Sequence, residues 1–183
     1  MRLFVDSSRF KSDPIVNSIG FDFGSVANLD IPESAKAFLA REGLPAAALL
    51  DVRFESWNGT FPTLGQYCDD RGWTRDLEAE EFYRVGTDGE TQLCIQRGSG
   101  HVVSIDPKHR YITRFVNSSI GQYISFLHTY SRYCKEVDGV DDDSAQLLVQ
   151  RTQTYFEETD LQAIVVRESW WSTILEQMRM GMA

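Results

Sequence analysis

The sequence predicts a single α+β domain, in which an antiparallel meander sheet of about four to six strands packs against several helices. Between residues 81 and 116, short β-branched and aromatic runs are separated by turns too short for parallel crossovers. After Asn117, apolar residues recur instead at intervals of three and four, the spacing of one helix face. A chain of 183 residues with 42% hydrophobic content can bury one substantial core, which favours one domain.

The N-terminal part is predicted to contain an arm and then a helix. Residues 1–29 show weak periodicity and are expected to form an extended arm packed on the domain, which occupies residues 30–183. Residues 30–33 (Asp-Ile-Pro-Glu) have the pattern of a capping box with an early proline, so the first helix is expected to begin there. Gly43 can adopt the left-handed backbone that ends a helix.

The strands are predicted from alternation and from turn signals. Residues 49–55 alternate as a strand does, and residues 57–62 are predicted to form a loop. A hairpin is expected from Glu81–Val85 to Gln92–Ile95, because the Asp-Gly pair at residues 88–89 tolerates the positive φ that tight turns require. The other predicted strands are His101–Ile105 and Tyr111–Val116.

The C-terminal third is predicted to be helical. The side chains of residues 117–119 (Asn-Ser-Ser) are interpreted as caps for a helix start rather than as an active-site cluster. Residues 136–143 are expected to form a solvated loop, and a capping box at residues 143–146 to begin the next helix. The indoles of Trp170 and Trp171 predict that a last helix docks on the domain.

Candidate catalytic residues form no recognisable pattern. Cys94, His101, His109 and His128 stand at no spacing that zinc sites favour, and no HExxH or CxxC motif is present. The sequence therefore predicts no catalytic residue, no metal site and no cofactor. A small hydrolase or transferase that uses Cys94 or His101 is an alternative.

Export and membrane insertion are not predicted. The N-terminus lacks the apolar run of roughly 7–15 residues that a signal peptide needs, and no run approaches the ~20 apolar residues of a membrane span. The cysteines Cys68, Cys94 and Cys134 are odd in number and widely separated, which does not favour a disulfide framework. A reduced, cytoplasmic protein with no membrane partner is expected.

The acidic residues are concentrated in two segments. Residues 69–90 contain eight acidic and three basic residues, and residues 134–160 contain eight acidic and two basic residues. The remaining chain contains 11 acidic and 13 basic residues, and the net charge is −9. This charge repels nucleic acid and anionic membranes. A solvated face that keeps the protein soluble and a surface that steers a basic protein partner are both consistent with the pattern.

Five short motifs follow one another in a characteristic order. They are FLAREGLP (Phe38–Pro45), FYRVG (Phe82–Gly86), GSGHVVSID (Gly98–Asp106), FVNSSI (Phe115–Ile120) and SWWSTILEQM (Ser169–Met178). This order, which covers about residues 30–180, resembles the SUKH immunity-protein superfamily and is closest to its fourth subfamily. The resemblance implies an SMI/KNR-like α+β fold without characteristic catalytic residues. It also implies a role in conflict between bacteria, in which a member binds a toxin encoded beside it, often a nuclease or nucleic-acid deaminase.

The resemblance and the charge together predict a non-enzymatic protein that binds a basic toxin and does not contact nucleic acid directly. A regulatory or scaffolding adaptor for another protein is the open alternative. Acidic residues are expected at the rim of the contact, and exposed aromatic residues are expected as anchors. The candidate contact residues are Trp57, Phe61, Asp69, Asp70, Trp73, Glu80, Glu81, Asp88, Asp138, Asp141, Asp142 and Asp143.

Overall fold

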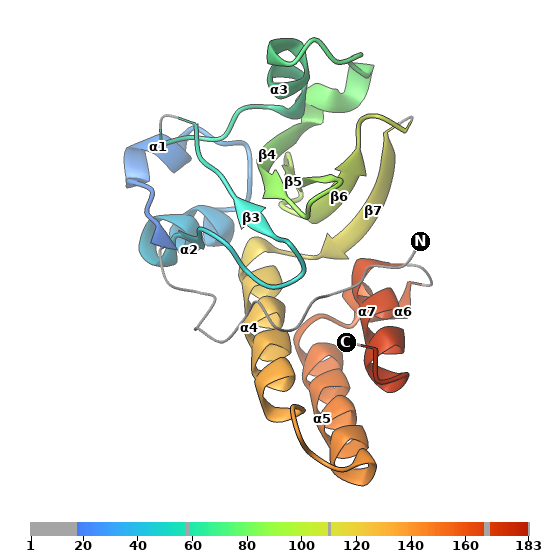
Figure 1. Cartoon of the computed structure of the whole chain (residues 1–183). Coiled ribbons are helices and arrows are strands. Elements are labelled where there is room, and N and C mark those ends of the chain that lie inside the picture. Colours follow the sequence, from blue (N-terminus) through green and yellow to red (C-terminus); the bar gives the residue numbers. More distant parts are fainter. Residues whose placement is uncertain (1–17, 58, 110, 167–168, 183) are drawn as a thin grey trace.

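A central antiparallel sheet lies between two groups of helices (Figure 1). The computed structural model describes residues 18–57, 59–109, 111–166 and 169–182. The α+β class and the meander topology are confirmed, because each strand pairs with the next one along the chain. In spatial order, the strands are β3 (Arg53–Phe54), β4 (Phe82–Thr87), β5 (Gln92–Gln96), β6 (Val102–Asp106) and β7 (Ile112–Asn117).

The predicted hairpin is present, whereas the strand predicted at residues 49–55 is much shorter. Gly89 has φ 94°, and the Asp88 carboxylate accepts hydrogen bonds from the amide and the hydroxyl of Thr91 at 2.9 and 2.7 Å. Leu50 and Asp51 have φ angles of 65° and 55°. A left-handed backbone conformation at these two residues forms a turn instead of a strand, so β3 contains only Arg53 and Phe54.

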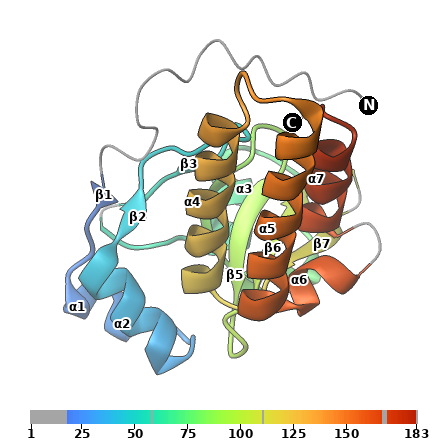
Figure 2. The same cartoon turned by 90° about the horizontal axis from the view of Figure 1, so that it is seen from below.

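The larger hydrophobic core lies between the sheet and a layer of helices. The helices are α4 (Ile120–Glu136), α5 (Asp142–Asp160), α6 (Gln162–Val165) and α7 (Trp170–Arg179), and Figure 2 shows α5 between α4 and α7. Trp171 is fully buried and contacts Phe126 and Phe156 edge-on, at centroid distances of 5.2 and 5.0 Å. The predicted docking of the C-terminal helix is therefore confirmed.

Short elements before β3 pack beside this core. They are β1 (Ser18–Ile19), α1 (Phe23–Ala27), α2 (Glu33–Glu42) and β2 (Leu44–Pro45), and β1 pairs with β2. Phe21 and Val26, from the segment predicted as an extended arm, are buried in the larger core. Residues 1–17 of that arm lie outside the described residues, and a domain boundary at residue 30 stays a prediction.

The start of α2 differs from the predicted capping box. The residue that precedes the helix is Pro32, and no side chain caps it. Asp30 instead bonds through its backbone: its N–H donates to the Tyr83 hydroxyl at 3.1 Å, and its carbonyl accepts from the Gly98 amide at 2.8 Å. The end of the helix is as predicted, since Gly43 has φ 70°.

A smaller layer, which the sequence patterns did not predict, covers the opposite face of the sheet. It contains α3 (Leu64–Asp70) and the 3-10 helix η2 (Leu77–Glu81), and we call residues 63–81 the α3–η2 layer. A second apolar cluster holds this layer on the sheet; its buried members are Leu64, Tyr67, Cys68, Ala79, Cys94, Val103 and Ile105. The capping box that begins α3 is formed by Thr63 and Gln66.

None of the described helices combines the length and the apolar character needed to cross a lipid bilayer.

Candidate protein-binding site

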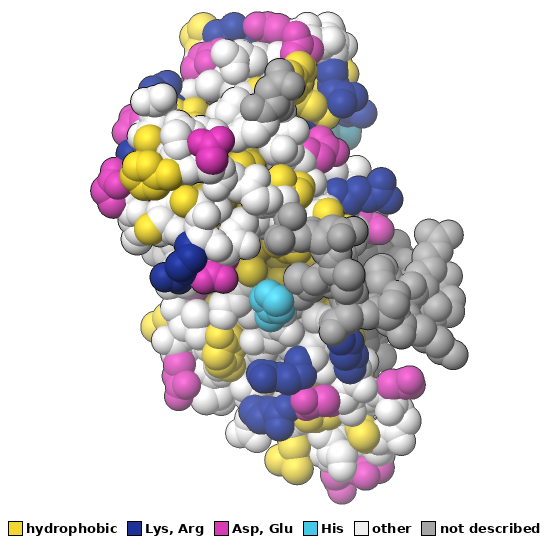
Figure 3. All heavy atoms as spheres, turned by 90° about the vertical axis from the view of Figure 1, so that its left-hand side faces the viewer, with side chains coloured by type: hydrophobic (Ala, Val, Ile, Leu, Met, Phe, Trp, Pro, Cys, Tyr) yellow, Lys and Arg dark blue, Asp and Glu magenta, His cyan; other side chains and the backbone are white. Residues whose placement is uncertain are grey.

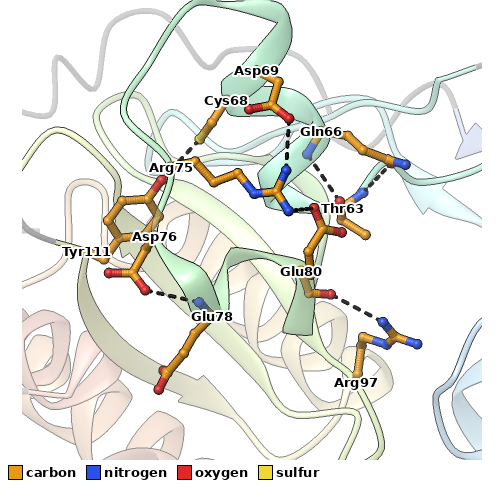
Figure 4. Close-up of polar contacts among 10 residues, drawn as sticks. All are labelled: Thr63, Gln66, Cys68, Asp69, Arg75, Asp76, Glu78, Glu80, Arg97 and Tyr111. Carbon is orange, nitrogen blue, oxygen red and sulfur yellow. Dashed lines mark hydrogen bonds and ion pairs between the residues drawn. The ribbon is translucent and has the colours of Figure 1, made fainter.

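The α3–η2 layer presents an exposed leucine among acidic side chains. Leu77, the first residue of η2, is 98% exposed. Its neighbours Asp76, Glu78 and Glu81 are exposed as well. The Asp76 carboxylate accepts a hydrogen bond from the Glu78 amide at 3.0 Å, which fixes the start of η2 (Figure 4). In protein–protein interfaces, apolar side chains commonly lie at the centre of the contact and charged side chains at its edge. Leu77 and the carboxylates around it have this arrangement.

Arg75 pairs with two of the predicted contact residues. Its Nη1 lies 3.0 Å from Asp69 Oδ2, and its Nη2 lies 2.9 Å from Glu80 Oε1 (Figure 4). These pairs connect the end of α3 to η2 and neutralise part of the local charge. The carboxylates of Asp70, Glu78 and Glu81, by contrast, form no ion pair with another described residue. Their charge is therefore available to a partner.

Trp73 is held in place by its own chain at the side of this layer. Its ring packs edge-on against Tyr67 at a centroid distance of 5.8 Å, and the Lys108 ammonium lies 5.0 Å from its centroid. Such cation–π contacts stabilise a half-buried indole in one orientation. The part of Trp73 that remains exposed is therefore ordered before any partner binds, which lowers the entropic cost of contact.

Tyr111, which directly precedes β7, holds the α3–η2 layer to the turn between β6 and β7. The Tyr111 hydroxyl donates a hydrogen bond to the Thr74 carbonyl at 2.8 Å. It also lies 3.5 Å from Cys68 Sγ (Figure 4). Burial, together with the hydrogen bond to Cys68, raises the pKa of Tyr111 to about 12. The phenol therefore keeps its proton at neutral pH and remains a donor.

The two acidic segments lie at opposite ends of the molecule. Asp69, Asp70, Trp73, Glu80 and Glu81 come together in the α3–η2 layer, but residues 138–143 lie at the other end, in the connection between α4 and α5 and the first turn of α5 (Figure 1). That second end holds the predicted contacts Asp138, Asp141, Asp142 and Asp143. The face of α1 and α2 mixes basic, acidic and hydrophobic side chains (Figure 3).

At the α4–α5 end, one of the acids is a helix cap. The Asp141 carboxylate accepts hydrogen bonds from the amide and the hydroxyl of Ser144, both at 2.9 Å, so Asp141 rather than Asp143 caps α5. These hydrogen bonds lower the pKa of the Asp141 carboxyl, the amide contributing most. Asp138, Asp142 and Asp143 remain exposed.

Three other predicted contact residues lie outside the α3–η2 layer. Phe61 is only 4% exposed and packs 4.7 Å from the Phe21 ring, so its expected exposure was wrong. Asp88 is half-buried, and its Oδ2 accepts a hydrogen bond from the Trp170 indole at 3.0 Å. Trp57 is 46% exposed in the loop between β3 and α3. Of these, Trp57 alone presents a large apolar surface to solvent.

The Asn-Ser-Ser motif is used in packing rather than in chemistry. Asn117 is fully buried; its Nδ2 donates to Asp160 at 3.0 Å, and its Oδ1 accepts from the Trp171 indole at 2.8 Å. The Ser118 amide and hydroxyl also donate to Asp160, at 2.7 and 2.8 Å. Ser119 caps α4 as predicted, but the cap interpretation was wrong for Asn117 and Ser118.

The candidate nucleophile Cys94 is inaccessible. It is fully buried, and burial raises the pKa of its thiol well above the usual value, so the reactive thiolate is disfavoured. His101 packs its ring edge-on against Phe115 at 5.5 Å. Within the described ranges, no group of three or more His, Cys, Asp or Glu side chains is placed to hold a metal ion.

The described residues form an α+β domain that exposes an acidic surface on the α3–η2 layer. The family model described as SUKH-4 immunity protein matches residues 20–177. The chain therefore belongs to the SUKH-4 immunity protein family, and the resemblance carried by its motifs is confirmed. Proteins of such families are in general not enzymes. No curated protein and no solved structure matches the chain.

The sequence indicated the acidic segments but not Leu77. A leucine between acidic residues carries no periodic signal, and its exposure depends on how η2 lies on the sheet. One local signal was present: Asp76, a residue type that caps helix starts, directly precedes Leu77 and Glu78. It could have predicted a short helical turn that begins at Leu77.

Proposed function

We propose that this protein protects the cell that makes it by binding and neutralising a basic toxin domain through the exposed surface of the α3–η2 layer. The observation that carries the proposal is the exposed Leu77 in a layer that also holds the carboxylates of Asp70, Glu78 and Glu81, which form no ion pair with another described residue. Family membership supports a toxin as the partner. Binding in the cytoplasm, before the toxin reaches its target, would follow.

The acidic character of this surface favours a nuclease or a nucleic-acid deaminase as the toxin. Enzymes that act on nucleic acid carry basic residues where they meet phosphate. A carboxylate-rich surface is attracted to the same residues, accelerates the encounter and competes with the substrate. Neutralisation then needs contact alone, without any catalytic step by the immunity protein.

A matched pair of charge variants tests the proposed surface. The first combines Asp70→Asn, Glu78→Gln and Glu81→Gln in the α3–η2 layer. The second combines Asp138→Asn, Asp142→Asn and Asp143→Asn at the opposite end. Both remove three negative charges and spare the helix caps Asp76 and Asp141. They therefore differ in the place of the change but not in net charge.

The measurement is affinity for the basic C-terminal domain of the large secreted protein encoded beside this gene, by calorimetry at low and high salt. The α3–η2 variant is expected to bind about tenfold or more weakly, with a smaller salt dependence, and to rescue growth poorly. The second variant is expected to bind as the wild type does. Equal losses would indicate a general charge effect, and a loss in the second variant alone would place the contact at the α4–α5 end.

The apolar anchor is tested with Leu77→Ser. Because the side chain is 98% exposed, this change should leave the free energy of unfolding unaffected. Affinity for the toxin domain is expected to fall about tenfold. If the wild type bound no toxin domain but retained another protein in a pull-down, the adaptor hypothesis would replace the present one.

A further inference from the structure

A groove along α5 lies outside the α3–η2 layer, and the proposed function does not use it. It consists of two adjoining depressions of about 460 and 150 Å³, which share Gln153 and Arg179 as a common wall. Leu147 lines the first depression, and Leu161 and Val165 line the second. These three side chains are 66%, 55% and 63% exposed. Val165 follows Leu161 by one helical turn, so these two side chains form one exposed apolar patch.

The spacing of these side chains fits one continuous site. Leu147 and Leu161 are separated by about 21 Å along α5, at about 1.5 Å per residue. They also lie within about 40° of each other around the helix axis, at about 100° per residue. The polar groups of the common wall are satisfied locally: Arg179 Nη2 donates to Gln153 Oε1 at 2.7 Å, and Gln153 Nε2 donates to Glu157 Oε1 at 2.7 Å. The groove therefore offers an occupant apolar contacts near its two ends, about four helical turns apart, with Gln150 and Gln153 between them.

The charges at the two ends of α5 are both negative. Asp142 and Asp143 stand in its first turn, and Glu157 and Glu158 are exposed near its end. The one basic residue of α5, Arg151, is already paired with Glu136. A basic occupant is therefore favoured at both ends of the groove.

The same charges argue against a second copy of this chain as the occupant. Two copies related by a two-fold axis would pack α5 antiparallel to its equivalent. The acidic first turn of each helix would then meet the acidic end of the other, and like charges in contact repel.

We infer that the α5 groove binds an amphipathic helix of a partner protein, with apolar residues about four turns apart on one face and lysine or arginine residues at both ends. Helices bind grooves of this kind through apolar residues at i, i+3, i+4 and i+7. The groove is formed by α5, α6 and α7, on the side of the sheet opposite the α3–η2 layer (Figure 1). The inference does not depend on toxin binding at that layer.

Two synthetic peptides of about 18 residues probe the groove in the full-length protein. They share one leucine and alanine face and differ only at their ends, which carry lysines in one and glutamates in the other. The lysine peptide is expected to bind with a Kd in the micromolar range, and the NMR shifts that it causes are expected to fall on α5, α6 and α7. The glutamate peptide is expected to bind at least tenfold more weakly. Equal binding of the two peptides, or shifts centred on another element, would overturn the inference.

Matched apolar variants separate groove binding from simple charge attraction. Leu147→Ser combined with Leu161→Ser removes two exposed groove side chains, and Phe23→Ser combined with Ile112→Ser removes two exposed ones elsewhere. The groove variant is expected to bind the lysine peptide about tenfold more weakly, whereas the control should not change its affinity. Undiminished binding by the groove variant would overturn the inference. Since no toxin is present, neither result bears on the proposed function.

Discussion

The buried carboxylate of Asp160 connects three parts of the chain that are distant in sequence. It is 5% exposed and accepts hydrogen bonds from the Asn117 side chain and from both the amide and the hydroxyl of Ser118. The Asn117 Oδ1 atom in turn accepts a hydrogen bond from the Trp171 indole N–H. A buried carboxylate is tolerated when donors satisfy its oxygens, and here they come from the junction of β7 and α4.

Replacement of this carboxylate by an amide is expected to destabilise the protein. Both oxygens of the Asp160 carboxylate accept hydrogen bonds. In Asp160→Asn, an NH2 group, which cannot accept a hydrogen bond, replaces one of these oxygens, so at least one donor loses its acceptor. The free energy of unfolding should fall by roughly 1–3 kcal/mol in urea titrations. Glu158→Gln, an exposed neighbour on the same helix, is the control and should not change it measurably. Equal urea midpoints for the two variants would show that the network does not stabilise the fold.

The helix cap Asp141 makes one contribution to stability dependent on pH. Hydrogen bonds from the Ser144 amide and hydroxyl lower the pKa of Asp141 in the folded state below its usual value. The stabilisation is therefore fully present above the unfolded pKa and is lost as pH falls through the folded pKa. Thermal unfolding should show a lower midpoint for Asp141→Ala than for the wild type at pH 7, and this gap should narrow below about pH 4.

Asp138→Ala provides the comparison for that experiment, because Asp138 is exposed and lies in the same connection outside the helix. Its midpoint should follow that of the wild type at every pH. A gap for Asp141→Ala that stayed constant down to pH 2 would mean that the ionised cap is not its source.

Elements with a local signal were predicted, and elements that depend on tertiary packing were not. The Asp-Gly hairpin and the last helix were found because one dipeptide or one apolar face determines each. In α3, by contrast, the helix has only seven residues, too few for a periodic pattern, and packing on Cys94 and Val103 stabilises it. Likewise, the acidic segments were visible in the sequence, but their separation to opposite ends depends on the path of the whole chain.

Gly43 ends α2 and lies beside the paired strands β1 and β2, and both its backbone conformation and its surroundings disfavour a side chain. Its φ of 70° and ψ of −161° belong to a region that is essentially restricted to glycine. A Cβ atom there would lie 2.4 Å from the Ile19 carbonyl oxygen. Gly43→Ala is therefore expected to lower the free energy of unfolding by roughly 2–4 kcal/mol, measured by urea denaturation.

Gly139→Ala separates the two causes of that loss. Gly139 also has a positive φ, 80°, but a Cβ atom there would meet nothing within 4 Å. This variant should lose only about 1 kcal/mol. A loss as large as that of Gly43→Ala would mean that backbone conformation, and not the approach of β1, dominates.

The molecule carries acidic side chains at both of its ends, and the neighbouring carboxylates at each end repel one another. The net charge is −9, and exposed like charges within about 10 Å interact less as salt is added. The midpoint of thermal unfolding should therefore rise by a few degrees between about 0.01 and 0.5 M NaCl. The triple variant of the α3–η2 layer should show a smaller rise. A midpoint that fell with salt would instead mean that surface ion pairs such as Arg75–Asp69 dominate.

The separate apolar cluster under the α3–η2 layer has an evolutionary consequence. The layer is a continuous stretch between β3 and β4, and its contacts lie on the face of the sheet away from Trp171 and the larger core. Residues 63–81 can therefore accumulate substitutions, or even change length, while the packing that determines the fold stays intact. If this layer is the toxin-binding surface, as proposed above, it can change in small steps with its toxin while the larger core keeps the protein folded.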